Sequence, residues 1–319
     1  MEVTGDNNNI IGKHLVKGAK HDASVTGHKT INILSIVCLI FCYILNITFN
    51  ALSGAGDSSV FNNTIGELSD KYQLNTTPAG WTFIIWSIIY FFIAMALIFF
   101  IITIFKQNHN GYIYLNPVVV SPTYCAVYGI NFLLNITWLF LWDREELAAA
   151  SSDLFAIFIT NVISLALLIN NIEREDHLLK REQPKIYWTY VILASNGQAL
   201  YCTWTFFASL LNFSICLVYV NGDTSLKAAA DINLSLVLIV VLGSAVMDIV
   251  YLDKFTRYLV TPYMVVVWAL AGVLSEQSNN EDIHQSTKNF TGVLMAIAIC
   301  LSLTKIATII FRKLKQPWN

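Results

Sequence analysis

The chain has 319 residues, of which 55% are hydrophobic and only 13% are charged, and its net charge is −2. So large an apolar share excludes disorder for most of the chain, and a charged share about half that of ordinary globular domains excludes a soluble core of this size. The near-zero net charge does not support nucleic-acid binding. The composition therefore predicts a multi-pass membrane protein, and we expect an all-α bundle because backbone groups in lipid must be satisfied within each segment.

Eight apolar stretches are long enough to cross the hydrocarbon core of a bilayer as helices. They cover residues 31–53, 81–105, 118–142, 150–171, 187–220, 229–251, 258–275 and 289–311. The fifth stretch is interpreted as one tilted or projecting span, because a break at Asn196-Gly197 would leave a first half too short to cross. Pro262 is expected to kink the seventh span or to mark its first turn.

The basic residues predict the orientation of these spans. With an even number of spans, 14 Lys and Arg residues share the side of the two termini and four lie on the other side. This bias places both termini in the cytoplasm, at the plasma membrane or an endomembrane. The predicted organisation is a disordered tail (1–30), a five-helix core (31–220), three additional helices (221–311) and a short cytoplasmic tail (312–319).

The external loop 54–80 is too long for a simple connection between neighbouring helices. Residues 66–72 are expected to form a short surface helix within it. The loop is interpreted either as a lid over the bundle or as a glycosylated surface loop. Asn62 and Asn75 begin N-x-[ST] sequons in the loop, so glycosylation at both is predicted for a eukaryotic secretory-pathway membrane.

Polar and aromatic residues recur at helical spacing inside the spans. Two such faces comprise residues 131, 135, 138 and 142, and residues 201, 204, 208 and 212. An amide without a partner is costly in hydrocarbon, so these side chains should face protein or a cavity. Interhelical amide bonds and interfacial tryptophan belts are the alternative explanation. Trp81 and Trp142, near span ends, fit such a belt, whereas Trp86, Trp138 and Trp204 lie deeper.

Three motifs carry a resemblance to a known family. The strings are Pro78-Ala-Gly-Trp81-Thr-Phe-Ile-Ile-Trp86-Ser-Ile-Ile-Tyr90, Leu134-Asn135-Ile-Thr-Trp138 and Trp204-Thr-Phe-Phe-Ala208-Ser-Leu-Leu-Asn212. In this order they resemble helices two, three and five of the tryptophan-rich sensory protein and translocator protein (TspO/MBR) family. The resemblance covers about residues 31–220, and the strings at 63–72 and 263–272 look like longer, eight-helix relatives.

The resemblance implies a bundle with an apolar cavity below the loop between helices one and two. Such a cavity would bind, sense or transport porphyrins, sterols or other flat lipophilic molecules. By motif position, the candidate ligand-binding residues are Trp81, Trp86, Tyr90, Asn135, Trp138, Trp204 and Ala208. This chain departs from the family after the second motif, where Leu139-Phe-Leu-Trp142-Asp143 replaces an aromatic-rich segment. The partners expected are membrane lipids and a lipophilic small molecule, with a homodimer as an option.

Asp248 and Lys305 are charges well inside predicted spans, and such residues are functional candidates. They are interpreted as a pair or as snorkelling side chains, with a secondary transporter using both for ion coupling as an alternative function. A membrane scaffold that binds no small molecule is a third. All six cysteines fall inside spans, which argues against disulfides and favours packing over a metal site. Enzyme and cofactor motifs are absent, so we predict no catalytic residues, no cofactor and no metal.

Overall fold

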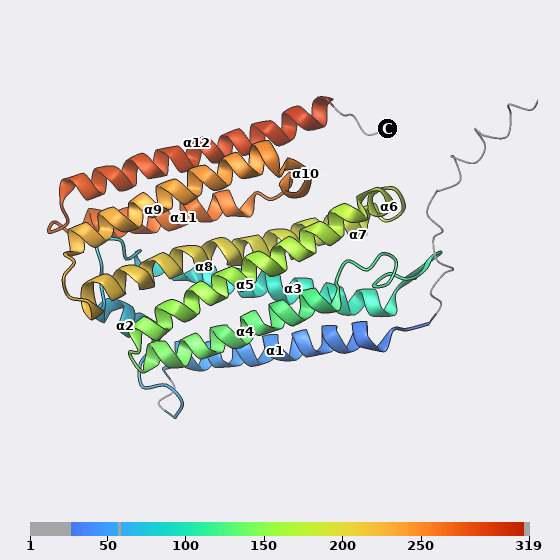
Figure 1. The fold of residues 1–319 in the computed structure, drawn as a ribbon, viewed down its shortest axis with the longest axis horizontal. Coiled ribbons are helices and arrows are strands. Elements are labelled where there is room, and N and C mark those ends of the chain that lie inside the picture. The colour runs from blue at the N-terminus through green and yellow to red at the C-terminus, as the bar shows by residue number, and fades with distance from the viewer. Residues whose placement is uncertain (1–26, 57–58, 316–319) are drawn as a thin grey trace, which may run out of the picture.

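The computed structural model describes residues 27–56 and 59–315. Most of the predicted disordered tail (1–30) lies outside these residues, as do the last four residues of the short C-terminal tail. The long helices run side by side along one axis and form a single elongated bundle (Figure 1). The predicted fold class, an all-α transmembrane helix bundle, is confirmed.

The helices follow the predicted spans closely. The first four spans are α1 (Thr30–Ala55), η1 with α3 (Gly80–Ile84 and Ile85–Phe105), α4 (Pro122–Asp143) and α5 (Leu147–Arg174). The fifth span comprises α7 (Pro184–Thr189), η2 (Tyr190–Ser195), α8 (Asn196–Ile215) and η3 (Cys216–Val220). The last three spans are α9 with η4 (Leu226–Val246 and Met247–Tyr251), α11 (Thr261–Asn279) and α12 (Gln285–Lys315). The short elements are α2 (Ile65–Lys71), α6 (Asp176–Glu182), α10 (Asp253–Thr256) and the antiparallel pair β1 (Gln107–Asn108) and β2 (Gly111–Tyr112).

Within the described part of the chain, seven helices are long and apolar enough to cross a membrane. The seventh predicted span, which corresponds to α11, is not among these seven helices. The polar C-terminal residues of α11, Ser275–Asn279, lower its mean hydropathy. It nevertheless lies in the bundle, packed against α8 and α12. Two positions were possible for Pro262, a kink within the span or the first turn of its helix. The structure places it in the first turn of α11.

The fifth span is one continuous helical run from Pro184 to Val220. Two stretches of it, η2 and η3, are π-helical, and such segments often mark functional sites. The chain does not break at Asn196-Gly197, in agreement with the single span that the sequence predicts, and Gly197 serves a packing role. A β-carbon on Gly197 would lie 2.9 Å from Cβ of Phe92, so glycine is what allows α3 to approach α8 closely.

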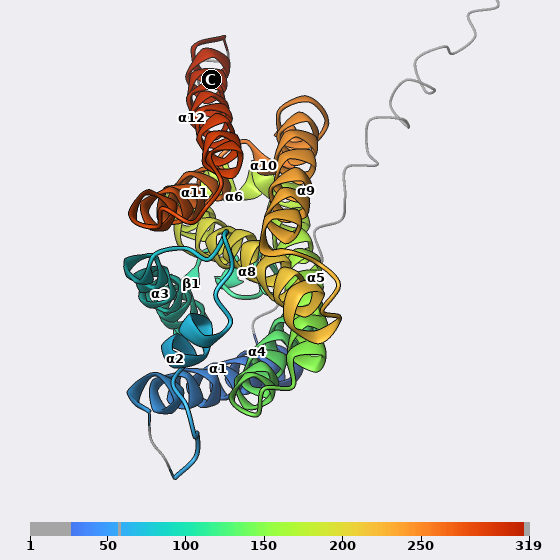
Figure 2. The ribbon, with the colours of Figure 1, turned by 90° about the vertical axis from the view of Figure 1, so that its left-hand side faces the viewer.

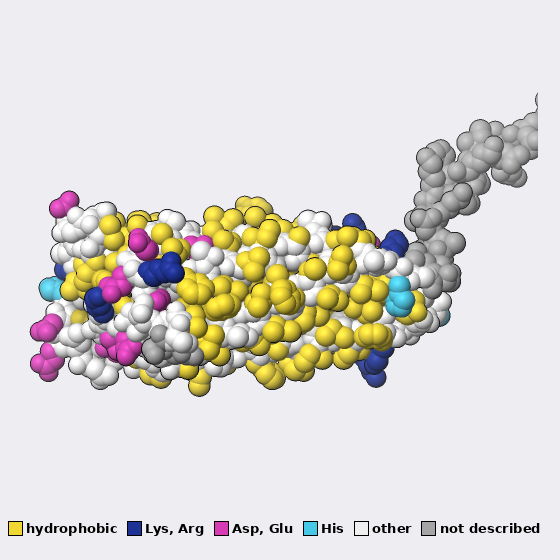
Figure 3. Space-filling model, turned by 90° about the horizontal axis from the view of Figure 1, so that it is seen from below, with side chains coloured by type: hydrophobic (Ala, Val, Ile, Leu, Met, Phe, Trp, Pro, Cys, Tyr) yellow, Lys and Arg dark blue, Asp and Glu magenta, His cyan; other side chains and the backbone are white. Residues whose placement is uncertain are grey.

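The outer surface of the bundle suits a bilayer. Figure 3 shows one face, on which a broad apolar band separates the two ends and the acidic side chains gather at one of them. The first span illustrates the pattern, because its outward residues include Ile31, Leu34 and Phe41, each more than half exposed. Such apolar exposure is favourable only in contact with lipid. Figure 2 shows α9 and α12 at the periphery of the bundle, on the side away from α1.

Candidate functional site: a tryptophan-lined cavity

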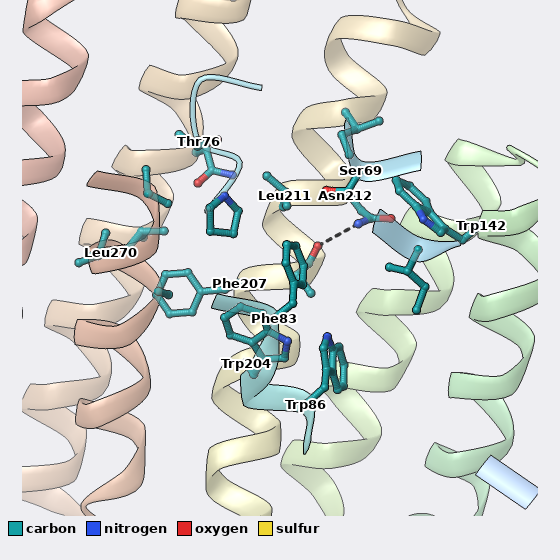
Figure 4. A pocket seen from close by; sticks show the side chains of 18 of the residues that line it. Ser69, Thr76, Phe83, Trp86, Trp142, Trp204, Phe207, Leu211, Asn212 and Leu270 are labelled. Carbon is teal, nitrogen blue, oxygen red and sulfur yellow. Dashed lines mark hydrogen bonds between the residues drawn. The ribbon is translucent and has the colours of Figure 1, made fainter. Parts of the chain in front are cut away.

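A cavity lies inside the bundle beneath the segment 59–80, and its walls come from separate helices (Figure 4). Helices α3, α4 and α8 contribute aromatic residues, α9 and α11 contribute a largely aliphatic wall, and the loop forms the roof. The lining residues that the argument uses are Trp86, Trp138, Trp142, Trp204, Ala208, Asn212, Asn233, Leu234, Val237, Ala269, Leu270 and Val273. The roof consists of Ile65, Ser69, Thr76 and Pro78.

The tryptophans converge because of their helical spacing. Trp138 and Trp142 are one turn apart in α4, and their rings stack with centroids 5.8 Å apart. Trp86 of α3 meets Trp204 of α8 edge to face at 6.3 Å. Ala208 stands one turn after Trp204 and leaves room beside it, since a larger side chain there would enter the hollow. The result is a set of aromatic faces from three helices around one space.

Five polar atoms of the cavity residues are buried without a hydrogen-bond partner. They are the indole Nε1 atoms of Trp138, Trp142 and Trp204, Oδ1 of Asn212 and Oγ1 of Thr76. The other end of the Asn212 amide is engaged, because Nδ2 donates to the carbonyl of Ala208 at 3.3 Å. Each unsatisfied buried group costs about 1–3 kcal/mol, so several around one cavity are a strong departure from ordinary packing.

The cavity is small as it stands, with a volume of about 80 Å³. A cavity of about 150 Å³ is known to accept benzene, so this one does not admit a larger ring system without movement. A second hollow of about 340 Å³ lies on the external side and shares five lining residues with the first. The shared residues are Ile65, Ser69, Pro78, Phe83 and Trp86. Displacing the roof would therefore join the two spaces.

The roof belongs to the segment 59–80, which we call the lid. It contains the short helix expected from the sequence, now bounded as α2, whose N-terminus is closed by a capping box between Thr64 and Glu67. Its first residues dock on α4, since the backbone N–H groups of Asn62 and Asn63 donate to Oδ1 of Asp143 at 2.7 and 2.9 Å. This part of the lid is tied to the bundle by a charge-assisted contact.

The second half of the lid is hydrogen-bonded to the bundle on two sides. Lys71 and Tyr72 both donate to the carboxylate of Glu145, and these hydrogen bonds lower the pKa of Glu145. On the opposite side, the carbonyl of Asn75 accepts from Nε2 of Gln277 at 2.9 Å, and the N–H of Ala79 donates to the carbonyl of Gly272 at 3.0 Å. Polar contacts thus hold the lid on two sides, and the buried side chains of Phe61, Leu68 and Leu74 anchor it in the apolar core.

Four of the seven predicted ligand-binding residues line the cavity together: Trp86, Trp138, Trp204 and Ala208. Trp81 does not; its side chain is 47% exposed, and its ring packs edge to face on Trp268 at 5.0 Å. Tyr90 lies one turn beyond Trp86 and stacks on it at 5.8 Å, outside the lining. The roles of all seven in ligand binding remain predictions.

Asn135 is placed in an interhelical amide cluster, away from the cavity lining. Its Oδ1 accepts from Nδ2 of Asn46 at 2.7 Å and from Nδ2 of Asn50 at 2.8 Å. Asn46 also donates to the carbonyl of Phe132 at 3.1 Å. Asn135 therefore makes interhelical amide bonds, which the sequence left open as the alternative to a cavity. These bonds join α1 to α4.

Sequence reasoning missed several cavity residues. Trp142 was assigned to an interfacial belt because it is near a span end, yet it is only 4% exposed and lines the hollow. Its spacing of four from Trp138 was the available signal. The wall from α9 and α11 had no signal, because Leu234 and Val237 are aliphatic residues like those that face lipid. Asn233 is the exception, an amide whose Nδ2 donates to Ser214 Oγ and the carbonyl of Leu210, both at 3.0 Å.

Asp248 and Lys305 meet at the other end of the bundle. Nζ of Lys305 lies 2.8 Å from both carboxylate oxygens of Asp248 and 3.1 Å from the carbonyl of Thr256. Tyr263 donates to the same carboxylate. All three protons of the ammonium group thus have acceptors, and this arrangement ties α12 to η4 and α11. The two side chains form a pair, and their role in ion coupling remains a prediction.

Within the described residues, His, Cys, Asp and Glu side chains form no group of three that could hold a metal ion. The cysteines in this part of the chain are free. The geometry of the bundle therefore offers one type of candidate site near the lid, an aromatic hollow with unsatisfied polar atoms. Its chemistry is that of binding: aromatic faces can stack on flat rings, and the polar atoms can orient them.

Fold and site together define a helical membrane protein with a tryptophan-lined cavity beneath the lid. Residues 33–307 match the family model described as TSPO-like protein, and the chain belongs to that family. The match runs through α9 and α11 into α12, so it includes the three additional helices as well as the five-helix core. No curated protein and no solved structure gives a significant match.

Proposed function

We propose that this TSPO-like membrane protein binds a flat lipophilic ligand, porphyrin- or sterol-like, in the tryptophan-lined cavity, and either senses or transports it. The observation that carries the proposal is the set of five unpartnered polar atoms around one aromatic hollow. A ligand with hydrogen-bonding groups on its edge would satisfy these atoms, while the rings of Trp86 and Trp204 would contact its faces.

The lid controls access in this proposal. The inner hollow is smaller than a ring system, whereas the hollow outside the roof is about 340 Å³. Binding would move Ile65, Ser69 and Pro78 outward and merge the two spaces. Polar contacts at the outer end and the buried apolar side chains of Phe61, Leu68 and Leu74 both oppose this movement, so the ligand must bind the open form more tightly than the closed form.

The test is a binding titration with protoporphyrin in nanodiscs, followed by quenching of tryptophan fluorescence. Trp204→Phe keeps an aromatic side chain, although a smaller one, and removes the Nε1 donor, so we expect binding at least about tenfold weaker, as for the loss of one hydrogen bond in a buried site. Trp81→Phe is the matched control, because Trp81 lies outside the cavity, and it should leave the affinity unchanged. Equal effects of the two substitutions, or saturable binding to neither protein, would refute the proposal.

We also propose that both termini are cytoplasmic and that the lid faces the opposite compartment. The distribution of Lys and Arg supports this orientation. Asn62 is exposed at the lid surface and Asn75 is half-buried, so Asn62 is the better acceptor for a glycan. Expression in a eukaryotic cell followed by glycosidase treatment tests the orientation. A mass shift that disappears in Asn62→Gln supports it, and modification of an engineered sequon at the other end contradicts it.

A further inference from the structure

A second cavity, of about 440 Å³, lies at the end of the bundle far from the lid. It is enclosed by the end of α5, by α6, by α7 with η2, and by α10 with the residues after it, and α6 and α10 mark this end in Figure 1. This is the end that the sequence predicts to be cytoplasmic. None of its lining residues belongs to the three motifs that carry the family resemblance, and none lines the proposed ligand cavity.

Four basic side chains line this cavity: Arg174, Lys180, Lys254 and Arg257. Two carboxylates, Glu173 and Asp176, also line it, so the formal charge of the lining is positive. His177 is present as well and adds positive charge if protonated. The opposite, inner part of the lining is apolar and includes Ile169, Ile172, Val191 and Leu259. The cavity therefore combines a basic rim with an apolar floor.

All four basic groups are paired in this structure: Lys180 with Asp176 and Arg257 with Asp253, each at 2.8 Å and partly buried, and Lys254 and Arg174 in pairs that a stronger anion can displace. Lys254 is 2.9 Å from Glu173 and Arg174 is 3.2 Å from Glu175, and the two cationic side chains are 72% and 64% exposed. Ion pairs this exposed contribute about 0–1 kcal/mol, whereas a phosphate accepts several charge-assisted hydrogen bonds at once. Both side chains can thus turn toward a phosphate at little cost.

Ser195 supplies an independent observation. It lines the cavity, is only 2% exposed, and its Oγ has no hydrogen-bond partner. Other serines of the same helix donate to the carbonyl four residues earlier, as Ser209 does at 2.7 Å and Ser214 at 2.9 Å. Ser195 ends the π-helical stretch η2, and the carbonyl four residues earlier, that of Val191, instead accepts from the backbone N–H of Asn196 and from its Nδ2 at 2.8 Å. An acceptor oxygen in the cavity would satisfy it.

We propose that this cavity is a binding site for a phosphate-bearing ligand. Arg174, Lys180 and Lys254 would bind the phosphate oxygens, with Ser195 donating a further hydrogen bond. The apolar floor beside the basic rim suits the headgroup region of an anionic lipid, since basic pockets between helices on the cytoplasmic side are typical sites for such headgroups. A soluble phosphate compound shares the same recognition chemistry.

The experiment uses the full chain in phosphatidylcholine nanodiscs and follows its thermal unfolding midpoint. One arm adds short-chain phosphatidylinositol bisphosphate and the other adds inorganic pyrophosphate. A rise with the lipid alone supports a lipid headgroup as the ligand, and a rise with pyrophosphate supports a soluble phosphate compound. If neither compound raises the midpoint, the proposal is overturned.

Substitutions distinguish binding in this cavity from nonspecific attraction of anions to basic residues elsewhere. Arg174→Gln and Lys180→Gln should each weaken the apparent affinity about tenfold, as expected for one lost charge-assisted contact. Ser195→Ala should weaken binding without lowering the unfolding midpoint in the absence of ligand, because its Oγ bonds to nothing in the protein. Lys313→Gln is the matched control, since Lys313 is exposed on α12 and does not line the cavity. An equal loss of affinity in this control would overturn the proposal.

Discussion

Gly272 of α11 lies directly against Thr82 of η1: a β-carbon on Gly272 would be 2.2 Å from Oγ1 of Thr82. The two segments are joined further by a hydrogen bond from Nε1 of Trp268 to the carbonyl of Thr82 at 3.0 Å. This close approach positions α11 so that Ala269, Leu270 and Val273 can complete the cavity wall. One of the three additional helices is therefore integral to the candidate site.

Gly272→Ala should destabilise the bundle, because the added methyl group meets a side chain next to the backbone and must push the two segments apart. Overpacking of this kind costs about 1–3 kcal/mol. Gly243→Ala is the control, since a β-carbon there meets nothing within 4 Å. Thermal unfolding in detergent should show a lower midpoint for the first variant and no decrease for the second. A midpoint that falls equally in both would contradict the packing argument.

The two intramembrane asparagines Asn135 and Asn212 should behave differently when changed to leucine. Asn135→Leu removes the acceptor of two amide hydrogen bonds and should lower stability by about 1–3 kcal/mol. Asn212→Leu removes an oxygen that bonds to nothing in the protein, and its main effect should be weaker binding of protoporphyrin. The measurements are thermal unfolding and fluorescence quenching. A stability loss for Asn212→Leu as large as that for Asn135→Leu would show that both amides are structural.

Lys305→Met should be strongly destabilising, because it leaves the carboxylate of Asp248 without its bidentate partner. Loss of one member of a buried ion pair costs about 3–5 kcal/mol. The Asp248→Asn, Lys305→Met double variant should recover part of this loss, since no unpaired charge remains. Thermal unfolding compares the three proteins. If instead the single variant unfolds like the wild type and only pH-dependent flux in proteoliposomes changes, the pair acts in ion coupling.

The lid should open more readily in acid. Hydrogen bonds from Lys71 and Tyr72 lower the pKa of Glu145 in the closed lid. A lowered carboxylate pKa stabilises the closed form fully above the ordinary glutamate pKa of about 4.3, and this stabilisation is lost as the pH falls through the lowered value. A cysteine placed at Thr76, a residue of the lid whose side chain is buried when the lid is closed, reports opening through its rate of maleimide labelling.

We expect labelling of the Thr76→Cys protein to accelerate as the pH falls below the ordinary glutamate range. Adding Glu145→Gln should accelerate labelling at neutral pH and remove most of the acid response, because the glutamine cannot titrate. Glu276→Gln is a control at the opposite side of the lid, where Gln73 donates to Glu276 at 3.3 Å in a contact that has no cationic partner. An acid response that survives in the Glu145→Gln protein would assign the opening to another group.

The class of protein and the positions of its spans could be predicted from the sequence alone. A run of apolar residues must be a helix in lipid whatever its neighbours do, so the eight predicted stretches correspond to the observed helices. The motifs around Trp86, Trp138 and Trp204 likewise indicated the family, since spacing along a helix determines which residues share a face. These are local properties, and each is readable within a single segment.

Only the tertiary structure decided which side chains meet. Asn135 and Asn212 are the same residue type at similar depth, yet one joins two helices and the other faces a hollow, because each outcome depends on the helix packed opposite. The wall supplied by Leu234 and Leu270, and the basic cavity closed by α6 and α10, depend in the same way on contacts between segments distant in sequence. Hydropathy determines that a helix crosses the membrane, while rotation and crossing of helices determine what lies between them.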